Sequence, residues 1–181
     1  MARNGSNTKV NSYRQNGASA PSSSGSPSPT YKPLPTFIRL FFYGLHGFFD
    51  EIVFTAIYEI IYGIPDARLL GYTSLYSFFI YSTGSYIIEQ LYLFLWVKHG
   101  ISTVPRIMLY VCVAFIWEFS FGLILRQFDA CPWDYSDRAL NFMGLITLTY
   151  APGWAFLGFW QDRLSVYLLN LRIVPDHQKV M

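Results

Sequence analysis

Residues 107–125 read "IMLYVCVAFIWEFSFGLIL", an apolar run in which Glu118 is the single charged residue. A helix of about 20 residues crosses the ~30 Å hydrocarbon core of a bilayer, and this run is long enough to do so. Lys is absent from its interior and from those of three similar stretches, whereas the helices of a soluble bundle carry a charged outer face. We therefore expect an all-α membrane protein with a four-helix transmembrane bundle. The predicted spans are about 40–62, 73–97, 106–125 and 142–162.

The composition of the whole chain agrees with a membrane protein. Of its 181 residues, 52% are hydrophobic and only 13% are charged, whereas a soluble domain has roughly 25% charged residues. The net charge of +2 is too small, and the Lys and Arg residues are too scattered, to indicate a nucleic-acid-binding surface. The expected partner is therefore the lipid bilayer and no nucleic acid, while other membrane subunits or a homo-oligomer stay open as further partners.

Residues 1–36 differ from the rest of the chain because Ser, Asn, Gly and Pro dominate them. A segment so poor in aliphatic residues cannot bury enough apolar surface to offset the entropy of ordering it. It also lacks the apolar core of a signal peptide. We expect a disordered cytoplasmic arm over 1–36, a transmembrane domain over 37–165 and a cytoplasmic tail over 166–181.

Lys and Arg residues are distributed unequally between the two sides of the predicted bundle. Ten of the 13 lie near the termini and around the loop between the second and third spans, and three, Arg68, Arg126 and Arg138, lie on the other side. Positive residues are enriched in cytoplasmic loops. We therefore expect an integral, multi-pass membrane protein with both termini in the cytoplasm; the sequence does not indicate which membrane it occupies.

The first and third spans contain similar sequences, which indicate an internal repeat. "AIYEIIYGI" (56–64) and "FIWEFSFGL" (115–123) align Glu59 with Glu118. Because both spans would run outward, the repeat would be a parallel two-plus-two repeat. A second register aligns Glu51 with Glu118 and places Glu59 level with Arg126. The residues alone do not decide between the two registers.

Polar residues follow one stripe along each predicted helix. A charged residue at the centre of a membrane helix costs about 2.5–3.5 kcal/mol, so these stripes should face the interior of the bundle. Two interpretations stay open: the charged residues line a polar pathway or pocket, or they only hydrogen-bond across helices and fix their packing. The expected intramembrane polar cluster comprises Glu51, Glu59, Glu89, Glu118 and Arg126.

The segment "DACPWDYSDR" (129–138) is the most polar loop between the predicted spans. We expect it to cap the outer mouth of the bundle, although its aromatic residues are also typical of a loop at the level of the lipid headgroups. The spacing of its acids does not match a calcium-binding loop. The expected cap consists of Asp129, Trp133, Asp134, Tyr135 and Ser136.

The chain contains no phosphate-binding loop, nucleophile elbow or zinc-protease motif. Cys112 and Cys131 are too few for a zinc site or a disulfide framework. His46 and Asp50, at i and i+4, are expected to pair with each other near the inner surface rather than to bind a metal. We expect no metal, no cofactor and no catalytic residue, and whether the chain is an enzyme stays uncertain.

Five segments resemble the transmembrane protein 229 family, and its B-type members most closely: "LHGFFDEIVFTAIYE" (45–59), "GYTSLYSFFIY" (71–81), "IWEF" (116–119), "GLILRQFDACPWDYS" (122–136) and "FMGLITL" (142–148). This resemblance implies a four-span, multi-pass protein and supplies no reaction or substrate. The "WDYS" segment, with the following Asn141 and Gly144, is also distantly similar to bacterial membrane proteins classed as type IV ABC-transporter components. That similarity implies at most a membrane subunit.

Three functions are consistent with these features. The first is a small transporter-like or permease-like protein with a carboxylate-lined interior. The second is a non-transporting scaffold or regulator, in which the buried acids only fix helix packing. The third is an intramembrane enzyme acting on lipid with His46 or a Glu as base; it is the least favoured, because the sequence shows no nucleophile motif.

Overall fold

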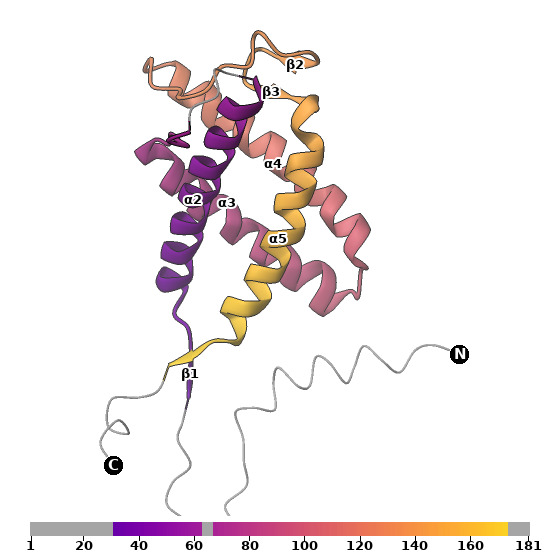
Figure 1. Cartoon of the computed structure of the whole chain (residues 1–181). Coiled ribbons are helices and arrows are strands. Elements are labelled where there is room, and N and C mark those ends of the chain that lie inside the picture. Colours follow the sequence, from indigo (N-terminus) through magenta and orange to yellow (C-terminus); the bar gives the residue numbers. More distant parts are fainter. Residues whose placement is uncertain (1–30, 63–66, 174–181) are drawn as a thin grey trace, which may run out of the picture.

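The computed structural model describes residues 31–62 and 67–173, which are mostly helical. The four α-helices of this part of the chain are α2 (Thr36–Tyr62), α3 (Leu75–Tyr92), α4 (Thr103–Arg126) and α5 (Ala151–Asn170). They pack against one another, with α3 and α4 running obliquely behind α2 and α5 in the view of Figure 1. The second of these helices in chain order is continued by a six-residue π-helix, η1 (Leu93–Lys98). The helical fold class predicted from the sequence is thus confirmed.

The fourth helix begins later than the sequence predicted, so the expected boundaries of 142–162 are wrong. Met143 and Gly144 have φ angles of 55° and 66°, which an α-helix cannot contain. Pro152 lies in the first turn of α5, where a missing N–H is tolerated. The residues before α5 instead form β2 (Asn141–Phe142), β3 (Ile146–Thr147), which pairs with β2 in antiparallel fashion, and the short 3-10 helix η2 (Leu148–Tyr150).

α2 and α3 approach each other closely at a glycine. A Cβ atom added to Gly47 would lie 2.1 Å from the Cβ of Tyr81, so any larger residue at this position would push the helices apart. On the same interface, Ser82 Oγ donates a hydrogen bond of 2.8 Å to the Leu40 carbonyl. Small residues and interhelical hydrogen bonds of this kind hold helices together in membranes.

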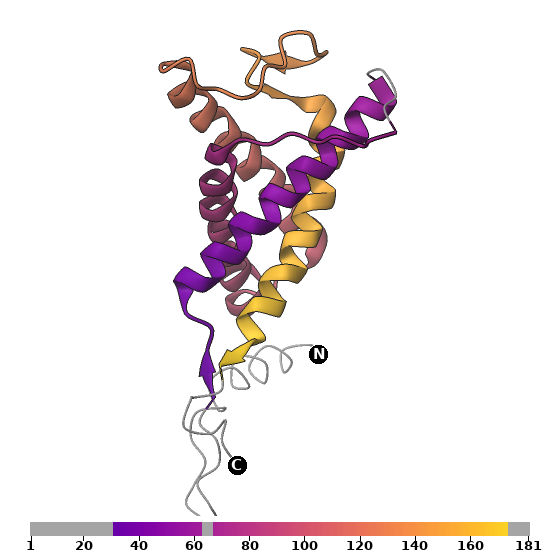
Figure 2. The same ribbon diagram turned by 60° about the vertical axis from the view of Figure 1, so that its left-hand side comes forward.

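The first and last described segments of the chain meet. β1 (Lys32–Pro33) precedes α2 and pairs in antiparallel fashion with β4 (Arg172–Ile173), which follows α5. Figures 1 and 2 show this pair at one end of the bundle, opposite the β2–β3 hairpin. The predicted domain limits therefore shift, because the arm expected over 1–36 ends in a strand and α5 continues beyond residue 165. Residues 1–30 and 174–181 lie outside the described residues.

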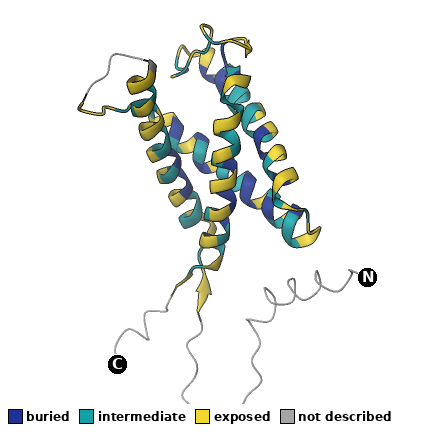
Figure 3. Ribbon diagram, turned by 45° about the vertical axis from the view of Figure 1, so that its right-hand side comes forward, coloured by how far each residue is buried: buried dark blue, intermediate teal, exposed yellow. Residues whose placement is uncertain are grey.

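Two of the four helices are long and apolar enough to cross a membrane, namely α2 over Thr36–Ile61 and α4 over Thr103–Arg126. Only 17% of the most apolar window of α2 and 11% of that of α4 is buried inside the structure. Most of their apolar surface therefore faces outward, as Figure 3 shows, unlike the buried core helix of a soluble protein. α3 and α5 carry more polar side chains and do not meet the same criterion.

Candidate functional site

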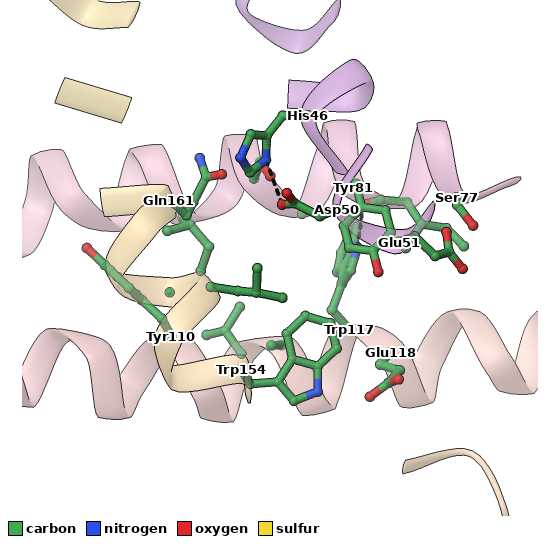
Figure 4. A pocket seen from close by; sticks show the side chains of 18 of the residues that line it. His46, Asp50, Glu51, Ser77, Tyr81, Tyr110, Trp117, Glu118, Trp154 and Gln161 are labelled. Carbon is green, nitrogen blue, oxygen red and sulfur yellow. Dashed lines mark hydrogen bonds and ion pairs between the residues drawn. The ribbon is translucent and has the colours of Figure 1, made fainter. Parts of the chain in front are cut away.

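A pocket of about 150 Å³ lies between the four helices. Each helix contributes side chains to it, and the loop between α4 and α5 adds two more (Figure 4). Its lining combines acidic and aromatic residues and contains neither Lys nor Arg. Its titratable acids and histidine are His46, Asp50, Glu51 and Glu118, and its aromatic residues are Tyr81, Tyr110, Trp117, Trp133, Tyr135 and Trp154.

Glu51 of α2 and Glu118 of α4 are both part of this lining, as the polar-cluster prediction had placed them. Glu51 Oε2 accepts a hydrogen bond of 2.7 Å from the Thr73 hydroxyl. Glu118 Oε1 accepts one of 2.8 Å from the Tyr135 hydroxyl. In contrast, Glu118 Oε2 and Trp154 Nε1 are buried and have no hydrogen-bond partner among the described residues. The pocket therefore holds one acceptor and one donor whose bonding capacity is unused.

His46 and Asp50 line the pocket on α2 and pair with each other, which confirms the predicted i,i+4 contact. His46 Nδ1 lies 3.0 Å from Asp50 Oδ2, and Trp160 Nε1 donates to His46 Nε2. Because Nε2 accepts a hydrogen bond, the proton of the neutral ring resides on Nδ1 and points to Asp50. The pair thus lies in the same pocket as Glu51.

Glu89, which the sequence placed with Glu51 and Glu118, belongs to a separate cluster. Its side chain is fully buried. Arg39 of α2 binds it with two hydrogen bonds, from Nε to Oε2 at 2.8 Å and from Nη2 to Oε1 at 3.1 Å. The hydroxyl of Tyr43 donates to Oε2 at 2.8 Å, and Arg39 Nη1 donates to the Leu34 carbonyl at 2.7 Å. We call this set the first clasp.

A second clasp joins α4 to α5. Arg106 binds Asp162 from Nη2 to Oδ2 at 2.8 Å and from Nε to Oδ1 at 3.3 Å. The hydroxyl of Tyr110 donates to Asp162 Oδ1 at 3.0 Å, and Arg106 Nη1 donates to the Ile101 carbonyl at 2.6 Å. The side chains of Arg106 and Asp162 are 4% and 3% exposed. Neither Arg106 nor Asp162 belongs to the polar cluster predicted from the sequence.

The two clasps have the same construction. In each, an arginine near the start of one helix binds an acid on the next helix and the carbonyl five residues before itself. A tyrosine four residues after the arginine donates to the same acid. The repeated pattern is visible in the sequence as "RLFFY" (39–43) and "RIMLY" (106–110), a signal that could have revealed both clasps. The number of residues between Arg39 and Arg106 is the same as that between Glu51 and Glu118. Aligning the two clasps therefore also aligns these two glutamates.

The remaining two members of the predicted polar cluster lie outside the pocket. Glu59 is exposed near the end of α2, and Arg126 is exposed at the end of α4. Arg126 Nη1 donates to the Met143 carbonyl at 2.7 Å, so it anchors the β2–β3 turn. Of the five residues expected to form one cluster, the structure brings together Glu51 and Glu118 in the pocket.

The loop between α4 and α5 closes one end of the pocket through Trp133 and Tyr135. Trp133 Nε1 donates to the Leu145 carbonyl at 3.1 Å, and Tyr135 reaches Glu118. Burial, reinforced by the nearby Glu118 carboxylate, raises the pKa of Tyr135 well above its usual value. Tyr135 therefore stays protonated and remains a hydrogen-bond donor.

The other three residues of the expected cap have different positions. Asp134 Oδ1 accepts hydrogen bonds from the Ser136 hydroxyl at 2.6 Å and from its backbone N–H at 3.0 Å. The hydrogen bond from the Ser136 side chain, followed by that from its backbone, lowers the pKa of Asp134. The stabilisation that the ionised carboxylate gives this turn is therefore present at neutral pH and is lost as the pH falls through the lowered pKa. Asp129 is exposed at the end of α4 with a φ of 52° and is not part of the pocket.

The clasps lie at the opposite end of the pocket from this loop. Tyr110 belongs both to the second clasp and to the pocket lining. Ser165 connects the first clasp to the pocket, because its Oγ lies 3.3 Å from the Tyr43 hydroxyl oxygen, to which it can donate, and accepts a hydrogen bond of 3.1 Å from the lining residue Gln161. Among the described residues, no group of three His, Cys, Asp or Glu side chains could hold a metal ion.

No protein-family model matches the chain. No solved structure matches it either. The resemblance to the transmembrane protein 229 family therefore stays a prediction, and the site is interpreted from its own geometry.

Proposed function

We propose that the chain is a transporter-like protein that crosses the membrane four times and moves a small solute through the pocket between its helices. The observation that carries this proposal is the pocket itself. Carboxyl groups from two helices line it, loop residues Trp133 and Tyr135 contribute to one end, and Tyr110 of the second clasp contributes to the other. A site between the helices can release a solute to either side if access to it alternates between the two ends of the bundle.

The polar residues of α3 and α5 are compatible with membrane spans because they are neutralised inside the bundle. Glu89 of α3 is held by Arg39, and Asp162 of α5 is held by Arg106. Charged residues in membrane segments characteristically face the bundle interior and pair with each other. The outward faces of the same helices are apolar, with Phe79 66% and Phe156 69% exposed. This arrangement supports four spans, although only α2 and α4 are apolar enough to be selected by hydropathy alone.

The pairing of β1 with β4 supports an even number of crossings. It brings residues 32–33 and 172–173 together at one end of the bundle, so the chain enters and leaves on one side. Together with the ten-to-three distribution of Lys and Arg, this supports a multi-pass protein with both termini in the cytoplasm.

The matching clasps support an internal repeat of two helix pairs, α2–α3 and α4–α5. They favour the register that equates Glu51 with Glu118 over the register that equates Glu59 with Glu118. In transporters built from repeats, the substrate site typically lies at the interface between the repeats. The pocket has this position, because it receives Glu51 from one pair and Glu118 from the other.

Membership of the transmembrane protein 229 family is part of the same proposal. It is supported by the segments "GLILRQFDACPWDYS" (122–136) and "FMGLITL" (142–148). These segments contain Glu118's partner Tyr135 and the turn that Arg126 anchors. These two of the resembling segments thus build the loop-covered end of the pocket.

Thiol labelling from each side of the membrane would test the proposal without knowledge of the solute. In a background with Cys112→Ser and Cys131→Ser, the pocket residue Ser85 is replaced by Cys in inverted and right-side-out vesicles. A transporter predicts that a membrane-impermeant reagent modifies Ser85→Cys from both sides. The control is Ser82→Cys, because Ser82 is 6% exposed and bonded to α2 and should stay unreactive.

A scaffold is the second candidate, and the clasps favour it. Glu89 and Asp162 are fully engaged by Arg and Tyr partners, so these two acids fix helix packing as the scaffold interpretation requires. If Ser85→Cys were as unreactive as Ser82→Cys from both sides, the scaffold would replace the transporter.

A further inference from the structure

The charge of the pocket is one-sided. Asp50, Glu51 and Glu118 line it, and Lys and Arg are missing from the lining. His46 pairs with Asp50 at 3.0 Å, so the carboxyl groups of Glu51 and Glu118 have no cationic partner in the lining. The clasp arginines are bound to the clasp acids and so do not neutralise the pocket. A bound cation would therefore be stabilised, and an anion would be repelled.

The walls of the pocket are aromatic. Trp117 and Trp154 line it together with Tyr81 and Tyr110. Trp117 is fixed in place because its Nε1 donates to the Ile80 carbonyl at 3.0 Å. Ring faces attract organic cations and also pack against apolar groups. Acids combined with such walls fit a cation that carries an apolar body better than a hydrated inorganic ion.

Glu118 supplies the specific contact. Its Oε1 atom is held by Tyr135, and its buried Oε2 atom has no hydrogen bond of good geometry in the described part of the chain, although the unpartnered Trp154 indole N–H is near enough to act on the carboxyl group. A buried acceptor without a donor is costly, and a ligand N–H would satisfy it. A quaternary ammonium ion has no N–H to donate. This requirement selects a protonated amine.

We propose that the pocket binds a small protonated amine with an apolar body, whose ammonium group donates to Glu118 and whose body packs between Trp117 and Trp154. This inference rests on the proposed function, since it names the solute class of the same pocket. The size agrees: about 150 Å³ is several times the ~30 Å³ that one water occupies in the liquid, which suits a small amine.

Tryptophan fluorescence of the full chain in lipid nanodiscs provides the test, because three of the five Trp residues line the pocket. The probes are phenethylamine, its neutral analogue phenethyl alcohol and its anionic analogue hydrocinnamate. We expect saturable binding of the amine at least about tenfold tighter than of either analogue, since a hydrogen bond between charged groups accounts for that difference. Equal binding of amine and alcohol would overturn the proposal.

The variant Glu118→Gln keeps the shape of the side chain and should weaken amine binding about tenfold while leaving alcohol binding unchanged. Circular dichroism and size-exclusion profiles would verify that it folds. Glu59→Gln, which removes an exposed acid outside the pocket, should bind the amine like the wild type. Unchanged amine binding in a folded Glu118→Gln variant would contradict the assigned contact.

The two proposals fail in different ways. In one case the protein binds the amine but does not take up labelled phenethylamine into proteoliposomes, and Ser85→Cys is unreactive from one side. That result would support the amine site and reject the transporter. Two-sided labelling of Ser85→Cys without selective amine binding would keep the transporter and reject the amine as its solute.

Discussion

Removing one charge from the second clasp should destabilise the protein strongly. Asp162→Asn keeps the side-chain shape but leaves the Arg106 guanidinium, 4% exposed, with an uncompensated charge. The Ile101 carbonyl, the Tyr110 hydroxyl and the rings of Tyr92 and Trp96 remain beside it, but none of them carries a negative charge. Breaking a buried ion pair from one side costs about 3–5 kcal/mol, which corresponds to at least about a hundredfold change in the unfolding equilibrium.

Reversible unfolding by SDS in mixed micelles, followed by circular dichroism, would measure this change. Asp137→Asn is the matched control, because Asp137 pairs with Arg138 at 3.3 Å but is 69% exposed, and such surface pairs contribute about 0–1 kcal/mol. Glu89→Gln in the first clasp should resemble Asp162→Asn, since the two clasps share one construction. The reasoning would be refuted if Asp162→Asn and Asp137→Asn had the same small effect.

Two further predictions concern backbone contact and the loop. Gly47→Ala should clearly lower the midpoint of unfolding in detergent, because the added Cβ would lie 2.1 Å from a side-chain carbon of the neighbouring helix. Gly153→Ala is the control and should not lower it, because a Cβ there has nothing within 4 Å. Equal midpoints for the two variants would exclude the close approach of α2 and α3. Asp134→Ala removes the hydrogen bonds to Ser136 that shape the loop, and the Cys131 thiol should then react several-fold faster with a water-soluble reagent. The control is Asp129→Ala, which should leave this rate unchanged, because the Asp129 side chain makes no such hydrogen bonds in the described structure.

The first three helices could be predicted from the sequence because each is a continuous apolar run that ends at a turn. The fourth could not be located from composition alone. "FMGLITL" (142–148) is apolar, but its backbone turns at Met143 and Gly144. Conversely, α5 extends past Asp162, a residue that looks unsuited to an apolar helix until Arg106 is placed beside it. That contact is remote in sequence, so periodicity does not reveal it.

The candidate site was predictable only in its general character. Helical periodicity indicated that the acids face inward, and the structure places Glu51 and Glu118 in one pocket. Helical periodicity did not indicate which acids have a basic partner, because Arg39 and Arg106 were counted only in the distribution of positive charge between the two sides. As a result Glu89 was grouped with the pocket although it belongs to the first clasp. The contact of Tyr135 with Glu118 depends on the path of the loop, which composition does not determine.

The central claim, that all four helices cross the membrane, is tested most directly on the two helices that hydropathy does not select. Phe79 on α3 and Phe156 on α5, which both lie on outward faces, are each replaced by a spin label. In liposomes, the accessibility of each label to oxygen and to a water-soluble nickel chelate is then measured. Leu140 in the loop, 71% exposed, serves as the water-accessible reference. Four spans predict that both labels collide with oxygen and are shielded from the chelate. Chelate access to either label equal to that at Leu140 would contradict the four-span protein.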